Sequence, residues 1–274
     1  MLTTMNDQLR GFSPTPQDLV LTLLGAHHGP RDGAVWSGGL VRLLGEFGFT
    51  EGAARVALNR LVARDLLSRN RTGRLVHYAL TPRTRAVLVE GDQRIFTLGE
   101  KPRRETTWTV LWHSIPEERR LARTRLISRL RFLGFGSVQD GTWLAPHDRE
   151  QELAALLKEF DVAEYAGVML GRPATAVDFG TFVARVWDLG ELAERYRAFV
   201  EHFRGREVGS DREALLLRTR LVHTFREFPS LDPELPEDLV PPPTHRADAL
   251  RLFHFLYPAL AAAAQRHFDK VTRP

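Results

Sequence analysis

Cysteine is absent from this chain of 274 residues. Its absence excludes disulfide bridges, thiolate metal sites and cysteine nucleophiles, and it fits a protein of a reducing compartment. No apolar run approaches the length needed to span a bilayer, and residues 1–11 lack the apolar core of a signal peptide. We therefore expect a cytoplasmic protein that has no membrane partner.

Lysine is scarce as well. Lys101, Lys158 and Lys270 are the only lysines, so arginine supplies nearly all of the 38 basic residues. The net charge is only +4, and an arginine bias can follow genome composition, so the overall charge favours a nucleic-acid partner only weakly. The length and the 43% hydrophobic content predict two or three ordinary globular domains.

Motifs for catalysis are missing too. The ten histidines form no HExxH motif, and the adjacent His27 and His28 point in different directions on a helix end, which makes a poor chelate. No phosphate-binding GxxxxGK[ST] loop and no GxSxG motif occurs. We therefore expect no catalytic residues, no metal ligands, no bound cofactor and no enzyme.

The most informative segment is residues 36–80, which read as two helices followed by a hairpin. Ser37 can cap a first helix over residues 38–47, which Gly48 ends. Thr50 can cap a second helix that runs to about Arg64. Helical spacing then places one apolar arc against a core, made of Ala54, Ala57, Leu58, Leu61 and Val62.

The opposite arc of the second helix carries Arg55, Val56, Asn59 and Arg60. Arginine pairs with guanine and asparagine with adenine in the major groove. We therefore predict that this arc reads base edges in double-stranded DNA.

Two short apolar runs, 66–68 and 75–80, flank a basic turn that contains Arg69, Arg71 and Arg74. From Arg55 to Arg85 the chain has eight arginines and the single acid Asp65, an excess that favours contact with phosphates. These features predict a winged helix-turn-helix DNA-binding domain over residues 14–96. A winged-helix module that binds protein is the alternative.

Two further domains are predicted, so the fold class is α+β and multidomain. A helix begins at Thr15-Pro16 and another at Thr81-Pro82, and the polar segment 97–107 marks the first boundary. Residues 107–187 then follow the order βαββαβ, which is typical of a ferredoxin-like domain. The remaining residues, 188–274, form a helical domain with helices at 189–204, 211–228, 245–257 and 258–268. Such a domain can dimerise a regulator and respond to an effector, or serve as a plain helical cap.

Several motifs in a fixed order resemble the PaaX-type repressors of phenylacetic acid catabolism. The motifs are LTLLG at 21–25, WSG at 36–38, LLGEFG at 43–48, RVALNRL at 55–61, SIPEER at 114–119, LGFG at 133–136, WLAPH at 143–147, LVH at 221–223 and FPSLDP at 228–233. The resemblance implies a homodimeric repressor that binds a palindromic operator. It also implies release by phenylacetyl-CoA or another acyl-CoA, and control of phenylacetate or related aromatic acid catabolism.

An acyl-CoA effector needs cations for its phosphates and an aromatic or apolar slot for its acyl group. Suitable residue types in the second and third predicted domains are Arg119, Arg120, Arg123, Trp143, Arg172, Arg218, Arg220 and His223. From these we select Arg119, Arg172 and Arg220 as candidate effector-binding residues.

The middle domain also resembles the small ferredoxin-like nucleases of CRISPR adaptation, whose first strand ends in a metal-binding aspartate. Here Ser114 stands at that place, and a serine hydroxyl is a poor ligand for Mg²⁺. The metal-binding aspartate that a nuclease of this kind needs is therefore missing at this position. A metal-dependent nucleic-acid-processing enzyme remains as an alternative function.

Overall fold

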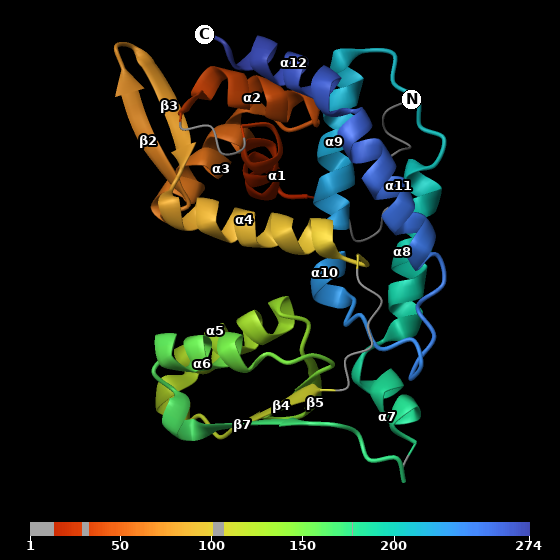
Figure 1. Ribbon diagram of the computed structural model, residues 1–274. Coiled ribbons are helices and arrows are strands. Elements are labelled where there is room, and N and C mark those ends of the chain that lie inside the picture. The colour runs from red at the N-terminus through yellow and green to blue at the C-terminus, as the bar shows by residue number, and fades with distance from the viewer. Residues whose placement is uncertain (1–13, 29–32, 101–106, 177) are drawn as a thin grey trace. The chain divides into compact units, whose positions relative to one another are not determined.

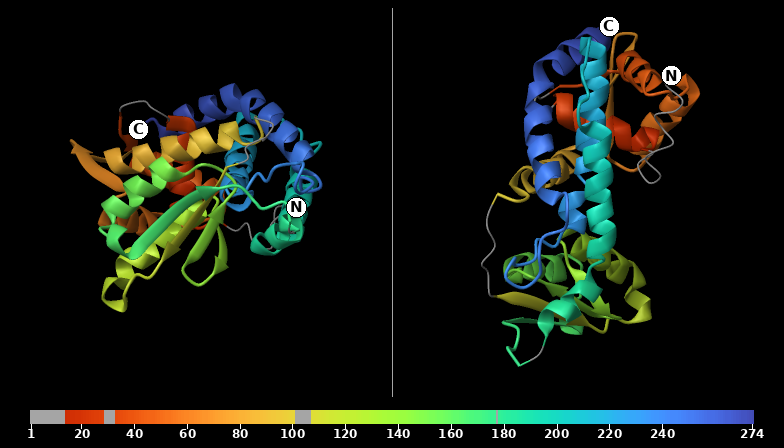
Figure 2. Two further views of the ribbon diagram at one scale, coloured as in Figure 1. Left: turned by 60° about the horizontal axis from the view of Figure 1, so that its bottom comes forward. Right: turned by 90° about the vertical axis from the view of Figure 1, so that its right-hand side faces the viewer.

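The computed structural model describes residues 14–28, 33–100, 107–176 and 178–274 (Figure 1, with further views in Figure 2). Contacts divide the chain into two compact units. Unit 1 combines residues up to 96 with 198–226 and 248–274, and unit 2 combines 97–197 with 227–247. The residues of the predicted helical domain are thus shared between the two units. The division into three domains stays a prediction.

Unit 1 begins with helices and strands in the order helix, strand, helix, helix, strand, strand. Their bounds are α1 Pro16–Leu23, β1 Val35–Trp36, α2 Ser37–Glu46, α3 Glu51–Ala63, β2 Leu67–Thr72 and β3 Leu75–Leu80, with a π-helical turn, Leu24–His28, after α1. Helix α1 begins after Thr15 as predicted. Thr15 caps it, because its hydroxyl accepts from the Asp18 N–H and the Asp18 carboxylate accepts from the Thr15 N–H.

The start of α2 differs from the prediction. Ser37 is the first helical residue and does not cap, and Trp36 holds the cap position without a side-chain hydrogen bond. Trp36 is also the last residue of β1, where it pairs with His77 of β3. The strand therefore runs straight into the helix. By contrast, Thr50 caps α3 as predicted, accepting from the Ala53 N–H.

The three strands of unit 1 form an antiparallel sheet in the order β1-β3-β2. Thr72 pairs with Leu75, so only Gly73 and Arg74 form the hairpin loop. Gly73 has a φ of +61°, which a glycine at the first loop position adopts without strain. The basic turn is therefore shorter than predicted, because Arg69 and Arg71 lie within β2 itself.

The C-terminal helices complete unit 1. The helices that contribute to it are α4 Pro82–Thr97, the end of α8 Leu189–Phe203, α9 Asp211–Phe225, most of α11 Arg246–Ala259, and α12 Ala261–Thr272. Helix α12 packs on α9 and α2, and Ala214, Ala264 and Phe268 share one apolar core with α1, α2 and α3. Pro258 was predicted to start the last helix, but it lies in the last turn of α11, which ends at the next residue.

Unit 2 is built around a four-stranded antiparallel sheet in the order β5-β6-β4-β7. The main elements are β4 Trp108–His113, α5 Arg120–Phe132, β5 Gly136–Gln139, β6 Thr142–Ala145, α6 Glu150–Glu159 and β7 Ala166–Gly171, with short 3-10 turns at Glu117–Arg119 and Ala163–Tyr165. Helices α5 and α6 form one core with the sheet. A second core, around Trp108 and Leu144, involves α7 Phe179–Val186, which the sequence did not predict.

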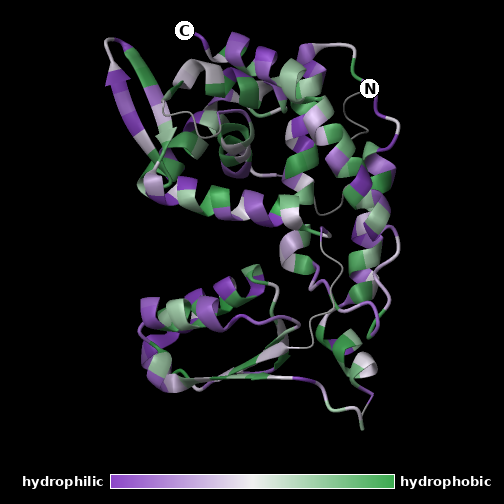
Figure 3. Ribbon diagram, viewed as in Figure 1, coloured by the Kyte–Doolittle hydropathy of each residue, from purple (hydrophilic) through white to green (hydrophobic). Residues whose placement is uncertain are grey.

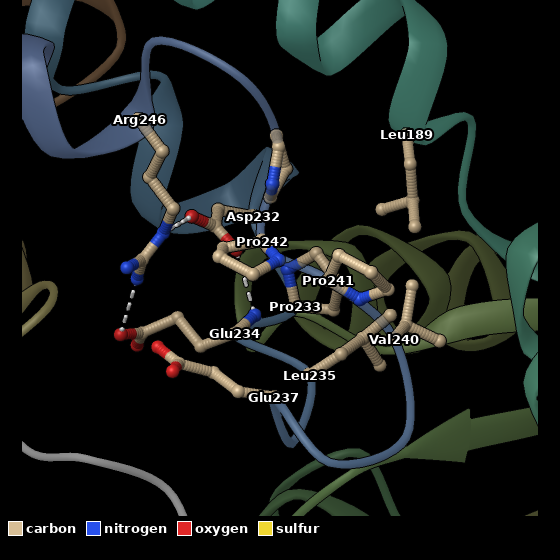
Figure 4. A pocket seen from close by; sticks show the side chains of 11 residues that line it. Leu189, Asp232, Pro233, Glu234, Leu235, Glu237, Val240, Pro241, Pro242 and Arg246 are labelled. Carbon is tan, nitrogen blue, oxygen red and sulfur yellow. Dashed lines mark hydrogen bonds and ion pairs between the residues drawn. The ribbon is translucent and has the colours of Figure 1, made fainter.

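The segment after α10 Phe228–Leu231 is fixed by buried charges in unit 2. The Tyr196 hydroxyl donates to Asp232 at 2.7 Å. Arg246 donates to both Asp232 and Glu234, as Figure 4 shows. Burial, followed by the charge of Asp232, holds the pKa of Tyr196 well above its usual range. The adjoining hollow has a volume of only about 30 Å³, room for a water molecule, so we assign this segment a structural role.

Candidate nucleic-acid interface

Helix α3 is amphipathic as the sequence predicts. Ala54, Leu58 and Leu61 are buried in the core of unit 1, and Ala57 is buried as well. The opposite side of the helix is exposed and is formed by Arg55, Val56, Asn59 and Arg60. Val56 is 49% exposed, and an aliphatic side chain left in solvent between two arginines is suited to contact with a thymine methyl group.

Arg55 forms an ion pair with Glu51, whose Oε1 lies 2.5 Å from Nη2. Both side chains are more than half exposed, so the pair contributes little stability and Arg55 stays available to a competing partner. We did not predict Glu51 as part of this surface, although its position four residues before Arg55 is the spacing of a helical ion pair. Within the described residues, Asn59 and Arg60 have no hydrogen-bond or ion-pair partner.

The hairpin arginines are exposed. Arg69 and Arg71 alternate with Asn70 and Thr72 along β2, so both arginines point to the same face as the buried Leu67. On that face Leu67 packs in the core that includes α3, whereas Arg69 and Arg71 lie farther along the strand and are exposed. Figure 1 shows the hairpin extending past the helices, and Figure 3 colours β2 mostly hydrophilic.

Arg74 lies in the hairpin loop and is also exposed. Arg71 donates from Nε to the Gly73 carbonyl oxygen at 3.1 Å, which leaves its terminal nitrogens for another acceptor. The DNA-contact residues predicted from sequence thus lie on α3 and the hairpin of unit 1. Their contact with DNA stays a prediction.

The three residues selected for effector binding belong to different units, Arg119 and Arg172 to unit 2 and Arg220 to unit 1. Arg119 pairs with Asp161 at 2.8 Å and lies over the Tyr165 ring, whereas Arg172 follows β7. These two positions are at opposite ends of β4, which spans about 17 Å. The two arginines are therefore attached near opposite ends of the sheet.

Arg220 belongs to α9 in unit 1, where it lies over the Phe47 ring at 5.7 Å. Burial lowers the pKa of Arg220, and the nearby Arg206 lowers it further. An acidic ligand group would relieve this repulsion, and effector binding by the three arginines stays a prediction. Among the described residues, no group of three or more acidic or histidine side chains is placed to hold a metal ion. Nor does that part of the chain contain a helix long and apolar enough to cross a bilayer.

Three family models match the chain in order. They are described as PaaX-like protein at residues 15–84, PaaX protein central Cas2-like domain at 101–180, and PaaX-like protein C-terminal domain at 187–270. The chain belongs to the PaaX family. The resemblance inferred from the sequence motifs is confirmed.

Individual proteins agree with membership of the PaaX family. The Transcriptional repressor PaaX of Escherichia coli (strain K12) is 27% identical over 257 residues, which are 90% of this chain and 80% of that protein. Among solved structures, the uncharacterized protein Rv0674 from Mycobacterium tuberculosis matches with a TM-score of 0.57 and 22% identity, over 94% of this chain and 99% of that one. The structural match shows a shared fold.

Proposed function

We propose that this PaaX-family protein is a transcriptional repressor that binds double-stranded DNA through a winged helix-turn-helix. The order of α1 to β3, with β3 in the middle of the three-stranded sheet, supports a winged helix with α3 as its recognition helix. The observation that carries the proposal is the exposed surface of α3, where arginine, asparagine and valine side chains face solvent beside a basic hairpin.

Each part of this surface has a distinct role in the proposal. Arg55 and Asn59 recognise base edges in the major groove, because their side chains can form paired hydrogen bonds with guanine and adenine. Arg69, Arg71 and Arg74 neutralise phosphates or enter the minor groove as the wing. The hairpin therefore supplies affinity, and α3 supplies sequence preference.

The remainder of the proposal concerns regulation. Membership of the PaaX family supports a cytoplasmic homodimer on a palindromic operator, with control of phenylacetate or related aromatic acid catabolism. Phenylacetyl-CoA or another acyl-CoA would be the inducer, and no cofactor or catalytic step would be involved. The chain has a second compact unit beyond the one that carries the winged helix, and this unit can supply an effector site separate from the DNA-binding surface.

Unit 2 is proposed to be a ferredoxin-like domain with no nuclease activity. Its sheet order, with β4 between β6 and β7, suits that fold. Ser114 follows β4 directly, and its N–H donates to the Tyr165 carbonyl oxygen at 2.8 Å. No carboxylate occupies this position at the end of the strand, which disfavours a metal-dependent nuclease.

A gel-shift assay with the duplex from upstream of the protein's own gene tests this function. A retarded complex is expected on that duplex, with weaker binding to a scrambled duplex of the same length. The same mixtures with Mg²⁺ or Mn²⁺ should leave the DNA intact, whereas cleavage would indicate the nucleic-acid-processing enzyme. Absence of any salt-dependent duplex binding would indicate a protein-interaction module instead.

A further inference from the structure

Unit 2 contains a large cavity that lies outside the DNA-contact surface described above. It has a volume of about 500 Å³, within the range of small-molecule sites. Helix α5 and the turn after it, strands β5 and β6, and the segment from α7 into α8 supply most of the wall. The lining residues are Arg131, Phe132, Phe135, Gly136, Ser137, Trp143, Val186, Trp187, Asp188, Glu191, Leu192, Arg195, Ser230 and Leu231.

The wall is aromatic and contains one unusual donor. Phe132, Phe135, Trp143 and Trp187 all line the cavity. Trp143 is only 4% exposed, and its buried indole N–H has no partner among the described residues. A buried donor without a partner is unfavourable, so a ligand carbonyl gains a hydrogen bond when the Trp143 ring turns its enclosed N–H towards the cavity.

The wall of the cavity is tightly packed where α7 meets β5. A Cβ atom added to Gly136 would lie 2.3 Å from Cγ1 of Val186 and 2.6 Å from Cε2 of Trp187, so the glycine lets the end of α7 pack directly on β5. A rigid aromatic wall favours a flat apolar group over a flexible polar one.

The charged groups of the cavity are unequally available. Glu191 is paired with Arg195 at 2.6 Å, and Asp188 accepts from the Glu191 N–H at the start of α8, so both acids already have partners. Arg131 is exposed and has no ion-pair partner within the described residues. The cavity therefore offers one unpaired positive charge for an anionic part of a ligand.

We propose that this cavity binds the acyl part of the effector, a compact aromatic group whose carbonyl oxygen accepts from Nε1 of Trp143 and whose anionic remainder lies near Arg131. The inference rests on the proposed function, since it assigns a site to its effector. The anion can be the phosphates of a CoA thioester or the carboxylate of a free aromatic acid. Both share an aromatic group, a carbonyl oxygen and negative charge.

Titration calorimetry of the full-length protein without DNA tests the site. The probes are phenylacetyl-CoA and benzoyl-CoA, with phenylacetate alone and CoA alone to separate the two sources. Ser137→Phe adds a ring to the cavity from an exposed position and should weaken binding of the better thioester about tenfold or more. Gln139→Phe adds the same ring to the same strand outside the cavity, and the affinity should change by less than about twofold.

Two conservative substitutions test the individual contacts. Trp143→Phe removes the N–H and keeps a ring, so it should weaken both thioesters about tenfold, whereas Trp112→Phe on the exposed side of β4 should not. Arg131→Gln should weaken binding of the anionic probes. Arg125→Gln, at another exposed position of α5, is the matched control. Circular dichroism melting checks that each variant is folded.

The outcomes separate the site from the function. Weaker binding by Ser137→Phe, with normal binding by Gln139→Phe, supports the cavity. Equal binding by wild type and a folded Ser137→Phe overturns the cavity and leaves acyl-CoA induction standing. No binding of any probe by the wild-type protein overturns the cavity and the effector part of the proposed function together. DNA binding is then judged by the gel shift alone.

Discussion

Arg218 on α9 lies next to His27, with its Nη1 3.3 Å from Nδ1 of the imidazole. The same Nη1 donates to the Ala26 carbonyl oxygen at 2.9 Å. A guanidinium only donates, so Nδ1 of His27 is an acceptor and its proton is on Nε2, which donates to Thr219 Oγ1 at 3.0 Å. This buried network joins α9 to the segment directly after α1 within unit 1.

The network predicts a loss of stability in mild acid. Burial, and then the charge of Arg218, lowers the pKa of His27 to about 3. The imidazole of His27 binds a proton at the ordinary pKa of 6.5 in the unfolded chain but not in the folded chain. The free energy of unfolding therefore has its full value above pH 6.5 and falls as the pH drops towards 3. His223 adds to the same trend, since burial and Arg226 lower its pKa to about 4.

Urea unfolding at pH 8 and pH 5 measures this effect. His27 alone should cost on the order of 2 kcal/mol between these two values. His27→Gln should reduce the dependence on pH, because glutamine keeps a donor and an acceptor but does not titrate. His254→Gln, at an exposed position of α11, is the control. The same dependence on pH in all three proteins would contradict the assignment.

Base recognition by α3 predicts a loss of selectivity. Arg55→Ala or Asn59→Ala should weaken binding to the operator by on the order of 1–3 kcal/mol, with a smaller effect on random DNA. Competition titrations with both duplexes measure the ratio of the affinities for operator and random DNA. Equal losses on the two duplexes would reassign these side chains to phosphate contacts.

The hairpin predicts a change in salt dependence. Arg71→Ala combined with Arg74→Ala should weaken binding to most sequences similarly, and should reduce the salt slope by about two phosphate contacts. Arg204→Ala with Arg251→Ala removes two exposed arginines elsewhere in unit 1 and should leave the slope unchanged. A hairpin variant with the wild-type slope would place the wing away from DNA.

The contact between α2 and α12 predicts opposite effects at two glycines of one helix. A Cβ atom on Gly39 would lie 2.6 Å from the Cα atom of Thr272, so Gly39→Ala should destabilise the protein by about 1–3 kcal/mol. A Cβ atom on Gly45 meets no atom within 4 Å, so Gly45→Ala should stabilise by up to about 1 kcal/mol. Thermal melting compares them, and two shifts of the same sign would contradict the close packing.

The sequence predicted those features that depend only on residues close together in the chain. Thr15 and Thr50 cap their helices because the hydrogen bond is made within three residues. The exposed arc of α3 follows from helical spacing alone. The sequence alone therefore assigns Arg55, Val56, Asn59 and Arg60 to the exposed side of this helix.

Features that depend on distant residues were not predictable in this way. Ser37 failed as a cap because Trp36 pairs with β3, about forty residues later. The sequence predicted Arg69 and Arg71 in a turn because this part of β2 lacks the apolar side chains that indicate a strand. Its pairing with β3 makes it a strand. The cavity of unit 2 combines residues from 131 to 231, a grouping that no local pattern contains.

Fluorescence anisotropy of a labelled upstream duplex bound to the protein tests the central claim most directly. Phenylacetyl-CoA should release the duplex at concentrations where phenylacetate and CoA together do not, since an inducer must bind the DNA-incompetent state more tightly. Calorimetry should show that the duplex weakens phenylacetyl-CoA binding by the same factor. If the duplex binds with no sequence preference, or if phenylacetyl-CoA binds equally with and without it, the account of an inducible repressor is contradicted.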